Sequence, residues 1–369
     1  MALNCGIVGL PNVGKSTIFS ALSSAKAEAA NYPFCTINPN FGIVALPDPR
    51  LDRLVELFQP ERRVPAVMEF VDIAGLVEGA SKNEGRGNQF LSHIRETAIL
   101  AHVVRCWDDP NIVHVANRVD PINDIEVILT ELALADLETV DKRLDKANRA
   151  IRVMGGEQKK AAEHELAALT KIRVALEQGQ PARKVSLSDD EAAEARAWFL
   201  LTMKPQIYVC NTDEDGIRSD NAHIAAVRAR AASEGADVVV ICGKFEAELA
   251  EMESAEDKLA FLAELGLQES GLSALIHAAY HLLGLRTFFT SGKDECRAWT
   301  IHSGDKAPQA AGVIHTDFEK GFIKADVYSY ADIDRLETES ALRAAGKIRM
   351  EGKEYLVQDG DVMFFKFNV

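Results

Sequence analysis

Short runs of Ile, Val and Phe alternate with amphipathic segments through much of the 369-residue chain. The apolar runs have the length and the β-branched content of buried strands, whereas segments such as 16–26 and 221–234 have helical spacing. This alternation predicts a doubly wound, mainly parallel α/β domain. The predicted strands are residues 5–8, 41–44, 67–71, 102–106, 206–210 and 237–241.

A segment without strand character, residues 122–203, interrupts the alternation. Apolar residues recur three and four positions apart in 137–151 and again in 166–176, with Gly155 and Gly156 between the two stretches. The pattern predicts an inserted antiparallel helical hairpin of the coiled-coil type.

The charge pattern sets this hairpin apart from the rest of the chain. Residues 136–184 contain eleven Lys and Arg against eight Asp and Glu, while the whole chain carries a net charge of −15. So acidic a protein does not coat nucleic acid through bulk electrostatics, and any contact with RNA must be local. The hairpin is therefore either a solvated helix surface or an arm that docks on an RNA-containing partner.

The remaining composition bounds the class of protein. No apolar run approaches the roughly 20 residues of a membrane span, and the first residues lack the pattern of a signal peptide. We therefore expect a cytoplasmic protein with no membrane contact. The six cysteines are scattered, without C-x-x-C pairs, which favours reduced thiols.

The last part of the chain changes character at about Leu283, where a strand-like run at 297–301, a helix or turn at 310–321 and a final strand at 361–365 predict a small α+β domain. The predicted domain limits are 1–121 with 204–282 for the α/β domain, 122–203 for the helical arm and 283–369 for the terminal domain.

A phosphate-binding motif lies between the first predicted strand and helix, where Gly9 to Ser16 reads G-L-P-N-V-G-K-S. Glycines at these positions let backbone N–H groups converge on a phosphate, and the following helix adds its positive end. Lys15 is expected to bridge the β- and γ-phosphates and to serve catalysis. The expected ATP-binding residues of this loop are Asn12, Val13, Gly14, Lys15, Ser16 and Thr17.

Three further residues are candidates around a Mg²⁺ ion. The Ser16 hydroxyl is a ligand in the P-loop pattern, and Asp72 follows a strand at the edge of the sheet where ligands bind, so it would hold Mg²⁺ through water. Thr36, in the loop between these motifs, would complete the shell. Gly75 would bring its N–H to the γ-phosphate, which makes the segment after it a nucleotide-sensing switch.

The base-recognition segment departs from the guanine pattern N-K-x-D. The strand 206–210 is followed by Asn211, Thr212, Asp213 and Glu214, so the Lys that packs over guanine and the Asp that accepts its two hydrogen bonds are both replaced. Adenine is the expected base. Asn211, Thr212 and Glu214 are candidate base contacts, and the turn at Cys242 and Gly243 is expected to close over the same ring.

The catalytic group is less apparent, because Leu76 stands where related GTPases carry the Gln that orients water. The polar, Gly-rich stretch 77–89 could bring Lys82 or Arg86 to the phosphates, or could be a simple surface loop.

Longer motifs show that the chain resembles the Obg-like ATPases of the YchF type over essentially its whole length. The motifs are G-L-P-N-V-G-K-S at 9–16, N-Y-P-F-C-T-I at 31–37, F-V-D-I-A-G-L-V-E-G-A-S-K at 70–82, G-N-Q-F-L at 87–91, N-x-x-E at 211–214 and I-H-T-D-F-E-K-G-F-I at 314–323.

The resemblance implies ATP in preference to GTP and a catalytic histidine, which matches His114 here. It also implies a terminal TGS domain of the β-grasp type and a coiled-coil arm, with the ribosome (large subunit or 70S particle) and its rRNA as partners of a monomeric protein. Gly243 departs from the family pattern and is expected to loosen the loop under the base. Mg²⁺ is the expected cofactor, and K⁺ binding through Asn12 stays open.

The leading interpretation is an ATPase whose nucleotide state controls docking on the ribosome. Two alternatives remain from the residues themselves. Leu76 leaves room for an ATP-bound scaffold with negligible turnover, and the Asn211 to Glu214 segment leaves room for an ordinary GTPase.

Overall fold

The computed structural model describes residues 4–24, 41–73, 86–110, 112, 118–252 and 254–368. By internal compactness the chain divides into two units. One unit comprises residues 1–24, 37–42 and 69–275, and the other comprises 25–36, 43–68 and 276–369. Residues 43–68, which the sequence assigns to the nucleotide-binding domain, thus cluster with the C-terminal part. The predicted domain limits themselves stay a prediction.

A six-stranded sheet forms the centre of the nucleotide-binding region, in the order β2-β4-β1-β5-β6-β7. The pairs β1–β4, β1–β5, β5–β6 and β6–β7 are parallel. All six strands predicted from the apolar runs are present. Their bounds are β1 (Asn4–Val8), β2 (Phe41–Ala45), β4 (Val67–Asp72), β5 (Ile99–Arg105), β6 (Gln206–Asn211) and β7 (Asp237–Ile241).

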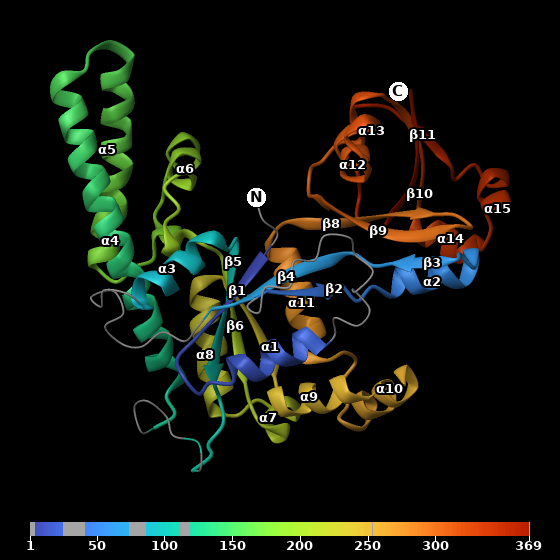
Figure 1. Cartoon of the computed structure of the whole chain (residues 1–369), viewed down its shortest axis with the longest axis horizontal. Coiled ribbons are helices and arrows are strands. Elements are labelled where there is room, and N and C mark those ends of the chain that lie inside the picture. Colours follow the sequence, from blue (N-terminus) through green and yellow to red (C-terminus); the bar gives the residue numbers. More distant parts are fainter. Residues whose placement is uncertain are drawn as a thin grey trace. The chain divides into compact units, whose positions relative to one another are not determined.

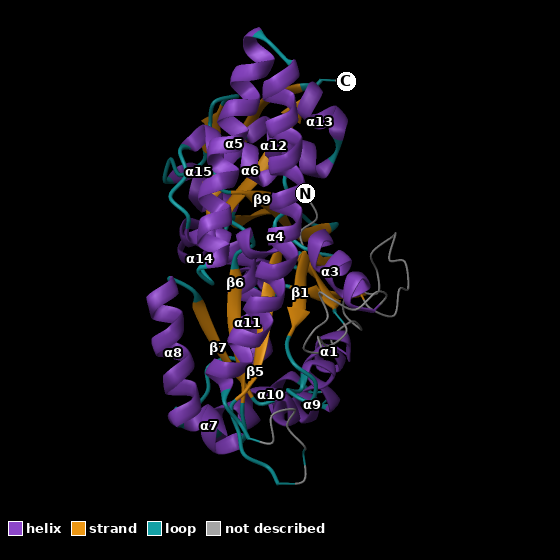
Figure 2. Cartoon of the chain, turned by 90° about the vertical axis from the view of Figure 1, so that its left-hand side faces the viewer, coloured by secondary structure: helices purple, strands orange, loops and turns teal. Residues whose placement is uncertain are grey.

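Helices flank these strands, with α8 and α1 on opposite sides of β1, β5, β6 and β7 in Figure 2. One core cluster joins Val104 and Tyr208 of the sheet to Ile125 of α4 (Pro121–Val153) and Val227 of α8. This is the doubly wound α/β architecture that the sequence predicted. The helices are α1 (Lys15–Ser24), α3 (Arg86–Glu96), α7 (Glu214–Arg218), α8 (Ala222–Glu234), α9 (Gly243–Glu251), α10 (Ala255–Glu264) and α11 (Gly271–Leu282).

The arm consists of α4 (Pro121–Val153) and α5 (Gly156–Glu177), which pack side by side (Figure 1). Leu169 and Ile172 of α5 share a buried cluster with Val140 of α4, so the apolar seam predicted from sequence forms the contact. Asp136 ties the base of the arm together, because its buried carboxylate accepts from the backbone N–H groups of Leu201 and Thr202 at 2.8 Å each. The chain returns through η2 (Ala182–Lys184), α6 (Asp189–Arg196) and η3 (Leu201–Met203).

A second six-stranded sheet, in the order β11-β10-β12-β8-β9-β3, builds the other unit. Its core joins Phe288, Val327 and Met363 to the small helix α12 through Ala310 and Ala311. The elements are α2 (Pro49–Phe58), β3 (Arg62–Val64), β8 (Leu285–Ser291), β9 (Glu295–His302), α12 (Ala307–Ile314), α13 (Thr316–Lys320), β10 (Phe322–Ser329), α14 (Tyr330–Leu336), α15 (Glu339–Ala344), β11 (Arg349–Glu351) and β12 (Asp361–Phe367).

The predicted fold class, an α/β sheet with a helical insertion and a C-terminal sheet module, is confirmed. None of the helices in the described part of the chain has both the length and the apolar character that a membrane crossing needs.

Candidate nucleotide-binding site

The predicted phosphate loop connects β1 to α1. Asn12, Gly9 and Gly14 have φ angles of 62°, 155° and 93°, in the region that favours glycine or asparagine. Lys15 is the first residue of the helix. The loop therefore directs the amino end of α1 toward the carboxyl edge of the sheet, which is the geometry of an anion site.

Gly9 and Gly14 are required by the lack of space for a Cβ atom as well as by their φ angles. A Cβ atom on Gly9 would lie 2.4 Å from the carbonyl oxygen of Val103 in β5, and one on Gly14 would lie 2.0 Å from Nδ2 of Asn211. Real Cβ atoms do not approach this closely, so any side chain would displace the loop. The P-loop thus packs directly on the backbone of β5 and on the base-recognition segment.

Lys15 and Asp72 form the charged centre of the site. Lys15 is only 7% exposed, and its Nζ donates to the carbonyl oxygen of Leu10 at 2.7 Å. Burial lowers the pKa of Lys15 to about 8, and the negative charge of Asp72 opposes this shift. Burial also raises the pKa of Asp72, with Lys15 opposing. Each charge thus partly compensates the desolvation of the other. The remaining desolvation favours an anion beside Lys15 and a cation beside Asp72.

Asn211 joins the base-recognition segment to the phosphate loop. It is the last residue of β6, and its buried Nδ2 donates to the carbonyl oxygen of Val13 at 2.9 Å. Its Oδ1 accepts from the backbone N–H of Gly243 at 3.0 Å. The side chain predicted to contact the purine is therefore a connection between two loops in this structure.

The residues after Asn211 have separate structural roles. Thr212 is buried, and its hydroxyl donates to the carbonyl oxygen of Cys106 at 3.2 Å. Asp213 caps α7 by accepting from the N–H of Gly216 at 2.9 Å. Glu214 is exposed and pairs with Lys244 at 3.2 Å. Asp213 and Glu214 are exposed, whereas Thr212 is buried.

Gly243 does not loosen the loop under the base, contrary to the expectation from sequence. It is the first residue of α9, after Cys242 at the N-cap, and both are buried. Burial also raises the pKa of the Cys242 thiol. Because the Gly243 N–H is held by Asn211, the segment is anchored to the P-loop instead of loosened.

Sequence reasoning missed Arg105, the last residue of β5. Its side chain is 1% exposed, and its guanidinium lies 4.7 Å from the centre of the Trp107 ring. It donates to the carbonyl oxygens of Trp107, Asp109 and Ile112 at 2.9–3.1 Å. One buried cation therefore holds the segment that follows β5. An Arg at the end of a mainly apolar strand was the only indication in the sequence.

The remaining predicted residues divide into two groups. Ser16 and Thr17 are exposed at the start of α1, beside the loop residue Asn12. Thr36, Gly75 and His114 lie outside the described residues, as do Leu76 and Lys82, and the side chain of Arg86 is also outside them. The structure thus brings together the P-loop, Asp72 and the segments at Asn211 and Gly243.

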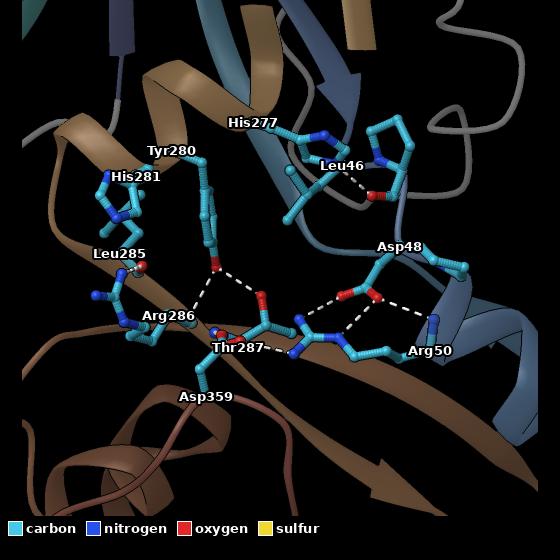
Figure 3. Close-up of a pocket in the computed structure, with 12 residues that line it drawn as sticks. Leu46, Asp48, Arg50, His277, Tyr280, His281, Leu285, Arg286, Thr287 and Asp359 are labelled. Atoms are coloured by element: carbon cyan, nitrogen blue, oxygen red, sulfur yellow. Dashed lines mark hydrogen bonds and ion pairs between the residues drawn. The ribbon is translucent and has the colours of Figure 1, made fainter. Parts of the chain in front are cut away.

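A separate pocket of about 440 Å³ contains none of the predicted residues (Figure 3). Its centre is Arg50, which pairs with Asp48 at 2.8 Å and with Asp359 at 2.6 Å. Tyr280 and His277 also form hydrogen bonds within the protein. Since these polar groups are paired with one another, we interpret the pocket as structural: its ion pairs and hydrogen bonds fix the start of α2.

The strand–loop–helix geometry at Gly9 to Lys15, with Asp72 at the adjacent strand end, defines a P-loop nucleotide-binding protein. A family model described as "50S ribosome-binding GTPase" matches residues 4–147, in agreement with this class. A second family model, of the C-terminal region of the YchF GTPases and described as a protein of unknown function, matches residues 285–368.

The chain belongs to the YchF family. It is 52% identical to the "Ribosome-binding ATPase YchF" of Bacillus subtilis and 53% identical to that of Escherichia coli O157:H7, with full coverage of each chain. It is also 44% identical to "Obg-like ATPase 1" of Caenorhabditis elegans, over 99% of this chain and 92% of that one. The solved structure of the Schizosaccharomyces pombe YchF GTPase matches with a TM-score of 0.89 and 41% identity, over 99% and 97% of the two chains.

Proposed function

We propose that this protein is an ATPase that binds and hydrolyses ATP with Mg²⁺ and uses its nucleotide state to regulate binding to ribosomes. The observation that carries the proposal is the P-loop site around Lys15 and Asp72 in a chain more than 50% identical to ribosome-binding ATPases. Three groups of residues contribute: the phosphate loop, the carboxylate at the end of β4 and the segments at the ends of β6 and β7.

Lys15 is the main phosphate-binding side chain in this proposal. Without nucleotide its ammonium donates to the Leu10 carbonyl and has a depressed pKa. A triphosphate supplies anionic oxygens that accept from Nζ, which restores the protonated form and positions the β- and γ-phosphates. The backbone N–H groups of residues 12–16 and the amino end of α1 hold the same oxygens.

The residues present fit a Mg²⁺ ion. Oδ1 of Asp72 is buried and, within the described ranges, has no hydrogen-bond partner. A buried carboxylate oxygen of this kind can accept a hydrogen bond from a water molecule bound to Mg²⁺. Ser16 would bind the metal directly, and Asp72 and Thr36 would complete its shell. When bound, the metal would neutralise charge on the phosphates.

Selectivity for adenine is proposed from the groups near the base. Guanine recognition needs a carboxylate free to accept two hydrogen bonds, whereas Glu214 pairs with Lys244. Asn211 uses both polar atoms in the protein; among the described residues its Nδ2 donates one hydrogen bond, and we assign its second hydrogen to the purine. GTP is the second candidate, because one matching family model and the fission-yeast structure carry the name GTPase.

Several finer assignments belong to the same proposal. His114 is the proposed catalytic group, replacing the Gln of related GTPases, and Asn12 is the candidate residue for K⁺. Ribosome contact is assigned to rRNA through the helical arm and the terminal domain, which we propose to be a TGS domain. The protein would act as a cytoplasmic monomer.

Nucleotide titration tests the base and the phosphate site together. Calorimetry with non-hydrolysable ATP and GTP analogues should show tighter binding of the adenine nucleotide. Lys15→Ala should abolish measurable binding or turnover, while Lys160→Ala, at an exposed lysine of α5, serves as a folded control with the nucleotide site intact. Tighter GTP binding would refute the base assignment, and normal turnover by Lys15→Ala would remove the P-loop from the mechanism.

Turnover with and without ribosomes tests the switch. Phosphate release by the wild-type chain should accelerate when 70S ribosomes are added, and a rate independent of them would favour the scaffold interpretation. His114→Ala should slow hydrolysis while ATP affinity is retained. A normal rate in that variant would return His114 to an ordinary surface histidine.

A further inference from the structure

The outer face of α4 carries an unusual row of side chains near the tip of the arm. Lys142, Lys146, Arg149 and Val153 are spaced four, three and four residues apart. At about 100° per residue, these four side chains fall within an arc of roughly 60° on the helix surface. They form a single exposed ridge on α4, which we call the α4 ridge.

The ridge faces away from the helix that packs against α4. Val140 and Leu144 lie on the opposite side of α4 and share a cluster with Leu169 and Ile172 of α5, and the buried Ala147 lies on that same side of α4. The α4–α5 contact therefore leaves the ridge uncovered within the arm. Figure 1 shows the α4–α5 junction at the far end of this pair of helices from the sheet of the same unit.

The ridge cations have few acidic partners. Among the described residues, neither Lys146 nor Arg149 forms an ion pair, and Lys142 has only a 3.9 Å contact with the exposed Glu138. Asp145 is the only acidic residue between Lys142 and Val153, and it lies about 100° around the helix from Lys146. Asp141, by contrast, is paired with Arg173 of α5 at 2.8 Å.

This local charge opposes that of the whole molecule. Residues 142–160 contain seven Lys and Arg and two Asp and Glu, in a chain with net charge −15. The α5 cations at the tip differ from the ridge, because Lys159 contacts Glu163 and Lys160 contacts Glu157. The ridge cations without an ion pair among the described residues are thus Lys146 and Arg149 of α4.

We propose that the α4 ridge binds the phosphodiester backbone of ribosomal RNA, an inference that rests on the proposed ribosome binding and assigns it to particular residues. Three long cations in a row complement a line of phosphates. A protein interface would instead bury an apolar or aromatic centre, and the ridge has only Val153, 83% exposed, at its end. The occupant is therefore RNA, held without base-specific contacts.

The test compares two variants with the same change in charge. Lys146→Ala with Arg149→Ala alters the ridge, and Lys159→Ala with Lys160→Ala is the matched control on α5. Co-sedimentation with purified bacterial 70S ribosomes is measured from about 50 to 300 mM salt, with purified rRNA as a second probe. Phosphate release without ribosomes reports that the nucleotide site is intact in both variants.

We expect the ridge variant to bind ribosomes and rRNA about 100-fold more weakly, roughly tenfold per cation, with a salt slope lower by about 2. The control should change affinity less than about threefold. If the ridge variant binds like wild type, the inference is overturned while the proposed function stands. If it loses ribosome binding but keeps rRNA binding, the partner is a ribosomal protein and the RNA assignment is wrong. If the unmodified chain binds no ribosomes, the proposed function itself fails.

Discussion

Replacement of Asn211 by alanine should weaken the whole nucleotide site, because one side chain connects two of its loops. The amide donates to the Val13 carbonyl oxygen and accepts from the Gly243 N–H, and all three residues are buried or nearly so. Asn211→Ala leaves one buried acceptor and one buried donor without partners. Each unpaired group costs about 1–3 kcal/mol, so the expected loss is roughly 2–6 kcal/mol before water enters the space.

Thermal unfolding measures this loss directly. For a domain of 150–250 residues, about 1 kcal/mol shifts Tm by about 2–4 °C, so we expect a fall on the order of 10 °C. ATP affinity should fall as well, since the Val13 carbonyl no longer fixes the P-loop. Asn211→Asp separates the two contacts, because its carboxylate still accepts from Gly243 but repels the Val13 carbonyl.

Glu214→Gln is the appropriate control, since it alters an exposed ion pair three residues further along the chain. An exposed pair contributes about 0–1 kcal/mol, and Tm should hardly change. An Asn211→Ala protein that melts within about 1 °C of wild type and binds ATP normally would refute the bridging role.

Three further predictions follow from buried groups in the same region. Lys15 has a pKa of about 8 without nucleotide and regains a proton when it binds phosphate, so ATP affinity should fall up to tenfold per pH unit above pH 8. Calorimetry in two buffers of different ionisation enthalpy should detect this proton uptake. If no proton is taken up, the lowered pKa of Lys15 is wrong. Burial raises the pKa of Glu246 from 4.5 to about 7, so its ionised form destabilises the fold increasingly from pH 4.5 to 7 and fully above pH 7. Glu246→Gln keeps an acceptor for the Gly271 N–H, so the variant should have the wild-type Tm near pH 4.5. At pH 8 its free energy of unfolding should exceed that of wild type by about 1–3 kcal/mol. The same Tm difference at both pH values would be inconsistent with burial of the charge. Gly243→Ala places a Cβ at an ordinary 3.4 Å from Asn211 and Thr17, so stability should be unchanged or raised by about 0.5–1 kcal/mol; a lower Tm in the same melting assay would show that the site needs glycine.

The parts of the fold that were predictable from sequence are those that depend on local pattern. The P-loop is contiguous in the chain. The strands of the parallel sheet are buried on both faces, so they appear in the sequence as uninterrupted runs of apolar residues. The hairpin of the arm is equally local, since its seam repeats every three or four residues. These features needed no knowledge of distant contacts.

The parts that were not predicted depend on contacts between distant residues. The Asn211–Val13 hydrogen bond joins positions 198 residues apart, so the asparagine was interpreted as a base contact. The strand Arg62–Val64 is short and polar, and it exists because it pairs with β9 at Glu295 to Arg297. Arg105 is fully buried among backbone carbonyls, an arrangement that no propensity describes.

Helix α4 connects the sheet that carries the nucleotide site to the proposed RNA contact. It is one continuous helix of 33 residues, about 50 Å long. At its start, Ile125 and Leu129 pack on the β5 and β6 side of the sheet.

Arg105, the last residue of β5, donates to the backbone carbonyl oxygens of Trp107, Asp109 and Ile112, and the α4 ridge lies near the C-terminal end of α4. A helix that packs on the sheet at its base and on α5 along its length moves as a rigid element. If nucleotide binding changes the packing of α4 on the sheet, the rigid helix carries that change to the ridge. The reciprocal holds for binding free energies: if nucleotide changes ribosome affinity, the ribosome must change nucleotide affinity by the same factor.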